Sequence, residues 1–301
     1  MKLLSAVSAA LLAPLFVGIV NQTKAFFAGR RGPGLFRLYF EIAKLLRKSC
    51  PRSTTSTWIF DVAPAVSLAS TLVAAAVFPW GPQPSAAASA CAALFFYLLA
   101  AGRFFTVLGA LDTGSAFEGM GASREVQFSA LAEPALFVVL GFLVLLTGSS
   151  SLGGMLGGYD PADWTHHSVS LVLVGVSFFV ILLCESSRVP FDDPETHLEL
   201  TMVHEAMVLD NSGPDLAFIL YGAALRTVLL AAFLVAMLLP NLGGGEWTRT
   251  FAVFGGTALV AVVVGVVESV MARMRFLKTP RVLLAALMTA VLGTLLFALF
   301  R

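Results

Sequence analysis

The sequence predicts an all-α integral membrane protein, with about eight transmembrane helices and one amphipathic helix at the membrane surface. Three observations predict this class. Hydrophobic residues make up 58% of the 301-residue chain and charged residues only 12%, whereas soluble domains are roughly half apolar and a quarter charged. The apolar residues are gathered into long runs, and the charged residues lie mostly between them. Such runs are what a helix needs to cross about 30 Å of hydrocarbon.

About eight apolar runs are long enough to cross a bilayer as helices. They cover residues 3–20, 60–80, 86–111, 131–147, 168–184, 216–239, 251–270 and 281–300. The first run is alternatively a cleaved signal peptide, because Lys2 precedes it and the sequence TKA follows it at residues 23–25. We expect residues 1–301 to form one membrane domain.

Basic residues are sorted toward one side of the predicted membrane. Residues 21–59 hold many lysines and arginines against the single acid Glu41, and a second basic segment covers residues 271–281. The opposite segments, 79–85, 148–167 and 240–250, hold almost none apart from Arg249. Because Lys and Arg are retained on the cytoplasmic side, we expect the segments 21–59 and 185–215 in the cytoplasm and both termini outside.

A short amphipathic helix is predicted within residues 34–48. Charged residues recur at helical spacing on one side of this segment, and leucines, Tyr39 and Ile42 fall on the other. The segment is too short and too charged to cross the bilayer, so it should lie in the interface.

The acidic segment ESSRVPFDDPETHLE, residues 185–199, directly follows the fifth apolar run. Ionisable groups at a membrane boundary are costly, so they indicate a functional site; the alternative is a solvated acidic loop. Asp193 is a good N-cap followed by a proline, which predicts a helix to about Asp210. In this helix Glu195 and Glu199 share one face, and His197 and His204 share the nearly opposite one. The two pairs therefore cannot form one metal site.

Four ionisable residues outside this segment stand within or beside apolar runs. They are Glu125, Glu133, Glu268 and Arg226, the last of which alternatively extends its charge to the interface. Burial raises the pKa of a carboxyl group, and a carboxyl that titrates near neutrality can relay protons.

The cysteines Cys50, Cys91 and Cys184 are isolated and supply no metal or iron–sulfur ligand set. No cofactor is therefore expected on this chain, and any electrons must be carried by a partner.

Several motifs occur in an order that resembles the subunit 1 family of respiratory complex I. The order is closer still to the branch of that family in formate hydrogenlyase and other energy-converting membrane-bound hydrogenases. The motifs are RRGPG at 30–34, LDTGS at 111–115, GASRE at 121–125, ESSRVPFD at 185–192, ESVMAR at 268–273 and TPR at 279–281.

The resemblance implies a multi-pass subunit of a prokaryotic cytoplasmic membrane that catalyses nothing alone. Its partners would be hydrogenase-like large and small subunits docked on the cytoplasmic face, antiporter-like membrane subunits and membrane lipid, with no nucleic acid. Iron–sulfur clusters, and nickel–iron in the hydrogenase branch, would belong to those partner subunits.

The resemblance also implies roles for particular residues. The proton-coupling set would be Glu185, Asp192, Asp193, Glu195, Glu199 and Glu268, with Glu125 or Glu133 as the membrane-buried carboxylate. Residues of a docking surface or quinone-like chamber would be Arg30, Arg31, Arg124, Arg188, His197, His204 and Glu205.

Two departures favour the hydrogenase branch over quinone binding. Asp193 stands where the complex I pattern has leucine, and His197 and His204 lie in a run not typical of the quinone-reducing branch. We therefore expect a membrane anchor that links electron transfer in a docked arm to ion translocation. The alternatives are a quinone-chamber subunit and a stand-alone ion or solute transporter, although the chain shows no internal repeat of the kind that many transporters carry.

Overall fold

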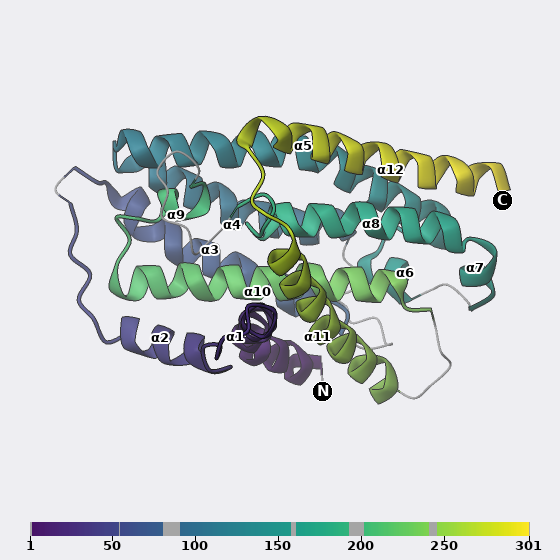
Figure 1. Ribbon diagram of the computed structural model, residues 1–301, viewed down its shortest axis with the longest axis horizontal. Coiled ribbons are helices and arrows are strands. Elements are labelled where there is room, and N and C mark those ends of the chain that lie inside the picture. The colour runs from purple at the N-terminus through teal and green to yellow at the C-terminus, as the bar shows by residue number, and fades with distance from the viewer. Residues whose placement is uncertain are drawn as a thin grey trace.

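The computed structural model describes residues 2–53, 55–80, 91–157, 161–192, 202–240 and 246–300. These residues form helices joined by short irregular segments, with one isolated bridge between Cys91 and Ser151 (Figure 1). Eight of the helices in this part of the chain are long and apolar enough to span a membrane. The predicted class and the predicted number of spans are both confirmed.

The eight long helices form one bundle. They are α1 (Lys2–Phe27), α3 (Trp58–Val77), α4 (Ala92–Asp112), α5 (Ala116–Thr147), α8 (Ser168–Glu185), α10 (Gly213–Leu238), α11 (Glu246–Val270) and α12 (Thr279–Phe300). The shorter elements are α2 (Arg37–Leu45), α6 (Leu152–Gly157), α7 (Pro161–His166), α9 (His204–Met207) and the 3-10 turn η1 (Phe276–Lys278).

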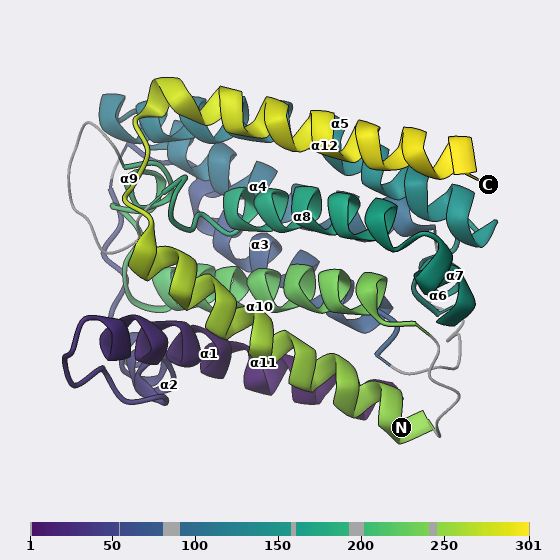
Figure 2. The same ribbon diagram turned by 45° about the vertical axis from the view of Figure 1, so that its right-hand side comes forward.

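The two ends of the bundle differ in what they carry. Helices α2 and α9 lie at one end, which we call the α2 end, whereas α6, α7 and both termini lie at the other (Figure 2). The basic segment after α1 and the segment after α8 therefore share the α2 end, as the alternation of spans predicts. Which side of the membrane this end faces remains a prediction.

Helix α10 is the central element of the bundle. It contacts α1, α3, α8 and α11. In the most apolar 18 residues of this helix, 72% of the residues are buried. A helix that is apolar all round is typical of such a buried position. Phe233 of α10 anchors an aromatic cluster, with its ring centroid 4.9 Å from Phe178 of α8 and 5.0 Å from Phe96 of α4. Aromatic contacts of this kind stabilise the core beyond area burial alone.

Helix α1 packs into the bundle as a membrane span. Ala9 and Ala13 are fully buried, and α1 lies against α11 at a point where Gly265 allows close approach. A Cβ atom at Gly265 would come within 2.6 Å of the Thr23 Cβ and 2.9 Å of the Val20 carbonyl oxygen. Small residues at such crossings are the usual means of close helix packing in membranes. This packing favours a span over the signal-peptide alternative.

The predicted start of the fourth span was wrong. Helix α5 begins at Ala116 rather than at residue 131, so Glu125 lies inside a helix and not in a polar loop. The segment 116–130 is too polar to read as membrane helix from hydropathy. It is helical because one side packs in the protein, where Gly121, Ala122 and Phe128 are buried.

The predicted helix from Asp193 to about Asp210 was also wrong in its described part. Residues 193–201 lie outside the described residues, and beyond them only His204–Met207 is helical. Side chains from elsewhere satisfy the backbone on either side of this turn. Arg124 donates to the Met202 carbonyl oxygen, and Glu118 accepts from the Asp210 N–H. A backbone satisfied in this way does not need a continuous helix.

The amphipathic helix is present but shorter than predicted, with α2 covering Arg37–Leu45. It contacts α1 and α10, and the Tyr39 hydroxyl donates to the Leu11 carbonyl oxygen. None of its residues is fully buried, so α2 lies on the surface of the bundle at the α2 end.

Replacing Gly265 with alanine should destabilise the bundle, because the added methyl group collides with the backbone of α1. Overpacking of this kind costs about 1–3 kcal/mol. The matched control is Gly255→Ala on the same helix, where a Cβ meets none of the described residues within 4 Å. Thermal unfolding in detergent should show a lower midpoint for Gly265→Ala only; equal midpoints for the two variants would contradict the close α1–α11 contact.

Candidate functional site

A buried arginine holds two carboxylates together between three helices. Arg103 of α4 forms an ion pair with Glu185 at the end of α8, and its Nε lies 3.6 Å from Oε1 of Glu125 on α5. It also donates to the hydroxyl of Ser129. The three charged side chains are 12%, 11% and 6% exposed. Charges buried this deeply require partners, so these residues form one unit, which we call the Arg103 cluster.

Sequence analysis found both carboxylates but missed Arg103. The signal was present, because Arg103 stands inside the predicted span 86–111 between Gly102 and Phe104. A charge in that position marks a functional site by the same reasoning that singled out Arg226 and Glu268.

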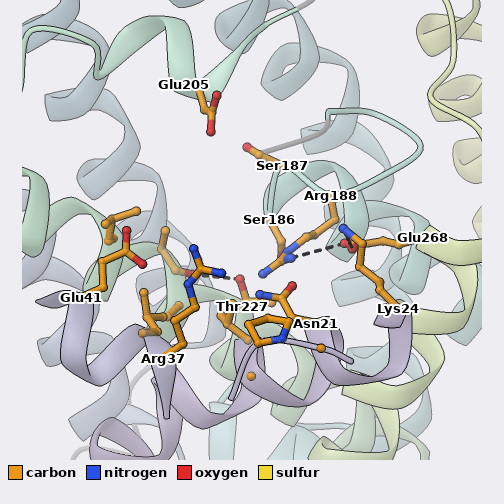
Figure 3. A pocket seen from close by; sticks show the side chains of 18 of the residues that line it. Asn21, Lys24, Arg37, Glu41, Ser186, Ser187, Arg188, Glu205, Thr227 and Glu268 are labelled. Carbon is orange, nitrogen blue, oxygen red and sulfur yellow. Dashed lines mark hydrogen bonds and ion pairs between the residues drawn. The ribbon is translucent and has the colours of Figure 1, made fainter. Parts of the chain in front are cut away.

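A second ion-pair group surrounds Glu268 of α11. Its side chain is fully buried, with Lys24 Nζ of α1 3.2 Å from Oε2 and Arg188 Nη1 3.4 Å from Oε1. The side chains meet at the edge of a cavity (Figure 3). The two cations provide the partners that a buried carboxylate requires.

Asp192 fixes the segment that follows α8. Its Oδ1 lies 2.7 Å from Nη2 of Arg273, and its Oδ2 accepts the backbone N–H of His204 at 3.0 Å. The Met274 N–H donates to the Pro190 carbonyl oxygen at 3.0 Å. The segments after α8 and α11 are therefore tied together, and α9 begins from a defined point.

Helix α9 is seated directly on α5. A Cβ at Gly121 would lie 2.9 Å from both the Ala206 Cβ and the Val203 carbonyl oxygen, so only glycine permits this contact. The Arg124 guanidinium lies 5.5 Å from the ring centroid of Phe276 and also donates to Met202. This seat places His204 in a partly buried position at the base of α9.

Glu118 is a buried carboxylate that sequence analysis did not single out. It is 1% exposed and accepts the Asp210 N–H at 3.1 Å. It stands three residues after the LDTGS motif, and its burial follows from the early start of α5.

A large cavity opens at the α2 end between α1, α2, α10 and the segments that carry residues 186–188 and 204–205. Its volume is about 1150 Å³. The wall combines apolar side chains of α10 with many charged ones (Figure 3). The charged lining residues are Lys24, Arg30, Arg31, Arg37, Arg188, Glu41, Glu205 and Glu268. A cavity that is apolar within and cationic at its mouth suits a polar or anionic group entering from the α2 end.

His204 lies between this cavity and the Arg103 cluster. It lines the large cavity and also a second cavity of about 10 Å³, whose wall includes Arg103 and Arg226. Burial lowers the pKa of His204; the carboxylates of Glu125 and Asp192 oppose this shift, and the two arginines add to it. Burial therefore favours the neutral form of the imidazole.

The remaining predicted residues that the structure describes lie at the surface. Arg30 and Arg31 are exposed at the mouth of the large cavity. Glu133 is exposed on the outer face of α5, whereas Glu125 is buried. Asp193, Glu195, His197 and Glu199 lie outside the described residues. Within the described ranges, no group of three or more His, Cys, Asp or Glu side chains could hold a metal ion.

The fold and the site define a multi-pass membrane protein with a buried charge network that opens toward one end of its helix bundle. The family described as NADH dehydrogenase matches residues 1–299. The chain belongs to this family, the subunit 1 family of respiratory complex I, and the resemblance drawn from the motifs is confirmed.

The chain is 34% identical to hydrogenase-4 component C of Escherichia coli (strain K12) over 283 residues, covering 91% of this chain and 88% of that one. It is 29% identical to formate hydrogenlyase subunit 4 of the same strain over 292 residues, covering 90% and 89%. Identity to a subunit of the NADH-quinone oxidoreductase of Rhizobium meliloti (strain 1021) is 31% over 230 residues, covering 66% and 64%.

The fold also matches a solved structure. A chain in the membrane-bound sulfane sulfur reductase, an archaeal respiratory membrane complex, superposes with a TM-score of 0.84 over 98% of this chain and 97% of that one, at 17% identity. Relatives of this chain are thus components of multi-subunit membrane complexes, which implies partner subunits here.

Replacing Arg103 with glutamine should destabilise the protein strongly, because two buried carboxylates lose their cation. Removing one partner of a buried ion pair costs about 3–5 kcal/mol, and adding Glu185→Gln should recover part of that loss. The control is Asp61→Asn, which removes only the exposed ion pair with Arg52, worth less than about 1 kcal/mol. Thermal unfolding of the purified protein measures all three variants; a wild-type midpoint for Arg103→Gln would contradict the buried cluster.

Acidification should destabilise the wild-type protein more than His204→Gln. Because the pKa of His204 is lowered from the ordinary 6.5, the unfolded chain binds a proton there at a higher pH than the folded chain. The stability that this residue contributes is complete above about pH 6.5 and is lost as the pH falls through the lower folded pKa. Unfolding midpoints between pH 7.5 and 5 should converge on acidification; parallel curves would show that the pKa is not lowered.

Proposed function

We propose that this chain is the membrane anchor and proton-coupling subunit of a hydrogenase- or complex I-like assembly in a prokaryotic cytoplasmic membrane. The observation that carries the proposal is the Arg103 cluster, a buried unit of one cation and two carboxylates close to a large cavity at the α2 end. Names of the relatives, which include hydrogenase-4, formate hydrogenlyase and NADH-quinone oxidoreductase, support an oxidoreductase complex.

The α2 end is the proposed docking face for the peripheral electron-transfer subunits. Its rim combines exposed basic residues, among them Arg30, Arg31 and Arg37, with exposed aromatic ones. The exposed aromatic side chains are Phe26, Phe27, Phe36 and Phe40. A rim of this composition suits a partner surface with acidic groups and apolar pockets. Hydrogenase-like large and small subunits, which would carry the iron–sulfur clusters and nickel–iron, are the proposed partners.

Coupling would work through charge balance in the Arg103 cluster. Electron transfer in a docked subunit changes the charge near the large cavity, and this change alters the proton affinity of buried carboxylates. Protonation of Glu185 or Glu125 weakens its ion pair with Arg103 and leaves the other carboxylate as the main partner. Because Arg103 can pair with either carboxylate, a change of charge near the large cavity is thereby linked to the protonation of Glu185 or Glu125 inside the bundle.

Glu133 marks the proposed exit toward a membrane partner. It is exposed on the outer face of α5 within the span, about two helical turns beyond Glu125 along the same helix. A carboxylate on that face is costly in lipid, which favours contact with a second membrane subunit of the antiporter-like kind.

A quinone-chamber subunit is the second candidate function. The volume of the large cavity, about 1150 Å³, would accommodate a quinone head group, and several relatives are named as components of NADH-quinone oxidoreductase. Asp193, His197 and His204 depart from the quinone-reducing pattern, so the hydrogenase-like assembly is preferred. A stand-alone transporter is a weaker alternative because the relatives belong to multi-subunit complexes.

Glu185→Gln should abolish proton translocation while electron transfer in the assembled complex continues. The tagged chain is purified with its native complex in mild detergent, identified by mass spectrometry and iron content, and reconstituted in liposomes. Hydrogen with a viologen acceptor, or NADH with a quinone acceptor, drives turnover while a pH-sensitive dye reports proton movement. Removing one relay carboxylate should lower translocation by about 100-fold, the contribution of a positioned proton-transfer group.

Asp61→Asn provides the matched control, because Asp61 also pairs with an arginine but is well exposed. It should leave both readouts unchanged. Full translocation in a correctly assembled Glu185→Gln complex would refute the proposed coupling. Purification of the chain alone and free of iron would refute the docking of an electron-transfer arm and favour the transporter.

A further inference from the structure

Three described residues border both cavities of the site: His204 and two residues of α10. The large cavity reaches His204 from the α2 end, and the small cavity lies on its other side. Ile219 and Ala223 of α10 complete the partition between the two spaces. These three residues separate the large cavity from the space next to Arg103. Of the three, His204 is the residue with a titratable side chain.

The small cavity is suited to a single water molecule. Its volume of about 10 Å³ corresponds to roughly one water-sized probe, and a buried water needs two to four polar partners. Ser67 and Thr106 offer hydroxyl groups, with their oxygens 3.3 Å apart, and Arg103 and Arg226 offer guanidinium N–H groups. The Nε of Arg226 is buried and has no hydrogen-bond partner among the described residues, so a donor is ready for an acceptor there.

The position of His204 is fixed by contacts on each side. Its backbone N–H donates to Asp192, which Arg273 holds in turn. Two residues further on, Ala206 packs against Gly121 of α5. The backbone of His204 is therefore held at the partition by the seat of α9.

We infer that His204 transfers protons between the large cavity and the Arg103 cluster through a water molecule in the small cavity. This inference rests on the proposed function and adds to it the residue that admits the proton. The neutral imidazole accepts a proton at one ring nitrogen from a donor in the large cavity. The N–H at the other ring nitrogen then passes its proton to the water, which gives one to Glu125. The water is regenerated and the imidazole is left as its other neutral tautomer, which rotation of the ring or exchange of its protons resets before the next transfer. No oxidant or reductant takes part.

The charges around His204 suit this step. Glu125 on α5 and Asp192 beside α9 attract a proton to the imidazole, whereas Arg103 on α4 and Arg226 on α10 repel it. On the side of the large cavity, the wall adds Glu205, Glu268, Arg188 and Lys24. The carboxylates thus draw a proton toward the imidazole, and the arginines favour its release. A relay must release its proton as readily as it accepts it.

The first test is His204→Gln in the reconstituted native complex. Glutamine keeps hydrogen-bonding capacity and most of the volume but does not titrate near neutral pH. Protons translocated per electron should fall by roughly tenfold or more, while electron transfer to a viologen or quinone acceptor persists. The dependence of translocation on pH between 5.5 and 8.5 should flatten. His167→Gln is the matched control, since His167 lies at the opposite end of the bundle and contacts Phe297.

Chemical rescue separates transfer from packing. His204→Ala should lose translocation, and free imidazole added at millimolar concentration should restore it, because the large cavity opens to the α2 end. A packing role predicts no rescue. Ala223→Val provides a second route should the His204 variants fail to assemble: its added methyl groups fill the small cavity, and translocation should fall with His204 still in place.

The outcomes distinguish the inference from the function on which it rests. If Glu185→Gln stops translocation but His204→Gln and Ala223→Val leave its yield and its pH dependence unchanged, the relay through His204 is refuted and the coupling role stands. If the assembled wild-type complex moves no protons, or Glu185→Gln moves as many as the wild type, the proposed function itself fails.

Discussion

The ion pairs of Arg103 are the constraint on which the rest of the site depends. A guanidinium group between membrane helices cannot be left unpaired, and each carboxylate beside it would be costly alone. The end of α8, the middle of α4 and the first half of α5 must therefore meet at one point. That meeting sets the level at which α8 stops and the following segment turns back toward α9. The cavity and its charged wall are built around this fixed point.

Most of the fold follows from hydropathy, whereas most of the site does not. The long apolar runs place the spans to within a few residues, because a bilayer demands length and apolarity from any helix that crosses it. Hydropathy fails at residues 116–130, where a polar stretch is helical because Gly121 and Ala122 face other parts of the protein. The structure of residues 202–210 was not predicted for a related reason. Its backbone is held by Arg124 and Glu118, which are distant in sequence, and no local pattern reveals such partners.

Several charged residues of the site could be recognised from the sequence, but their pairing could not. Glu185, Asp192 and Glu268 were recognisable because each stands beside or within an apolar run. Their pairing was not, since it depends on helices α1, α4 and α11 that approach only in the folded bundle. Choosing between Glu125 and Glu133 required knowing which side of α5 faces inward. That choice depends on rotation of the helix about its axis, which a sequence without a distinct apolar face leaves undetermined.

The outward position of Glu133 has a consequence for the life of the protein in the cell. A newly made chain that inserts alone presents a carboxylate to the lipid from the side of a span, a state that costs several kcal/mol on insertion scales, about +2.5–3.5 for an aspartate at mid-bilayer. A second membrane subunit that covers this face removes the cost. Under the proposed contact, unassembled copies would expose a carboxylate that assembled copies cover, and a difference of this kind would let membrane proteases remove orphan subunits selectively.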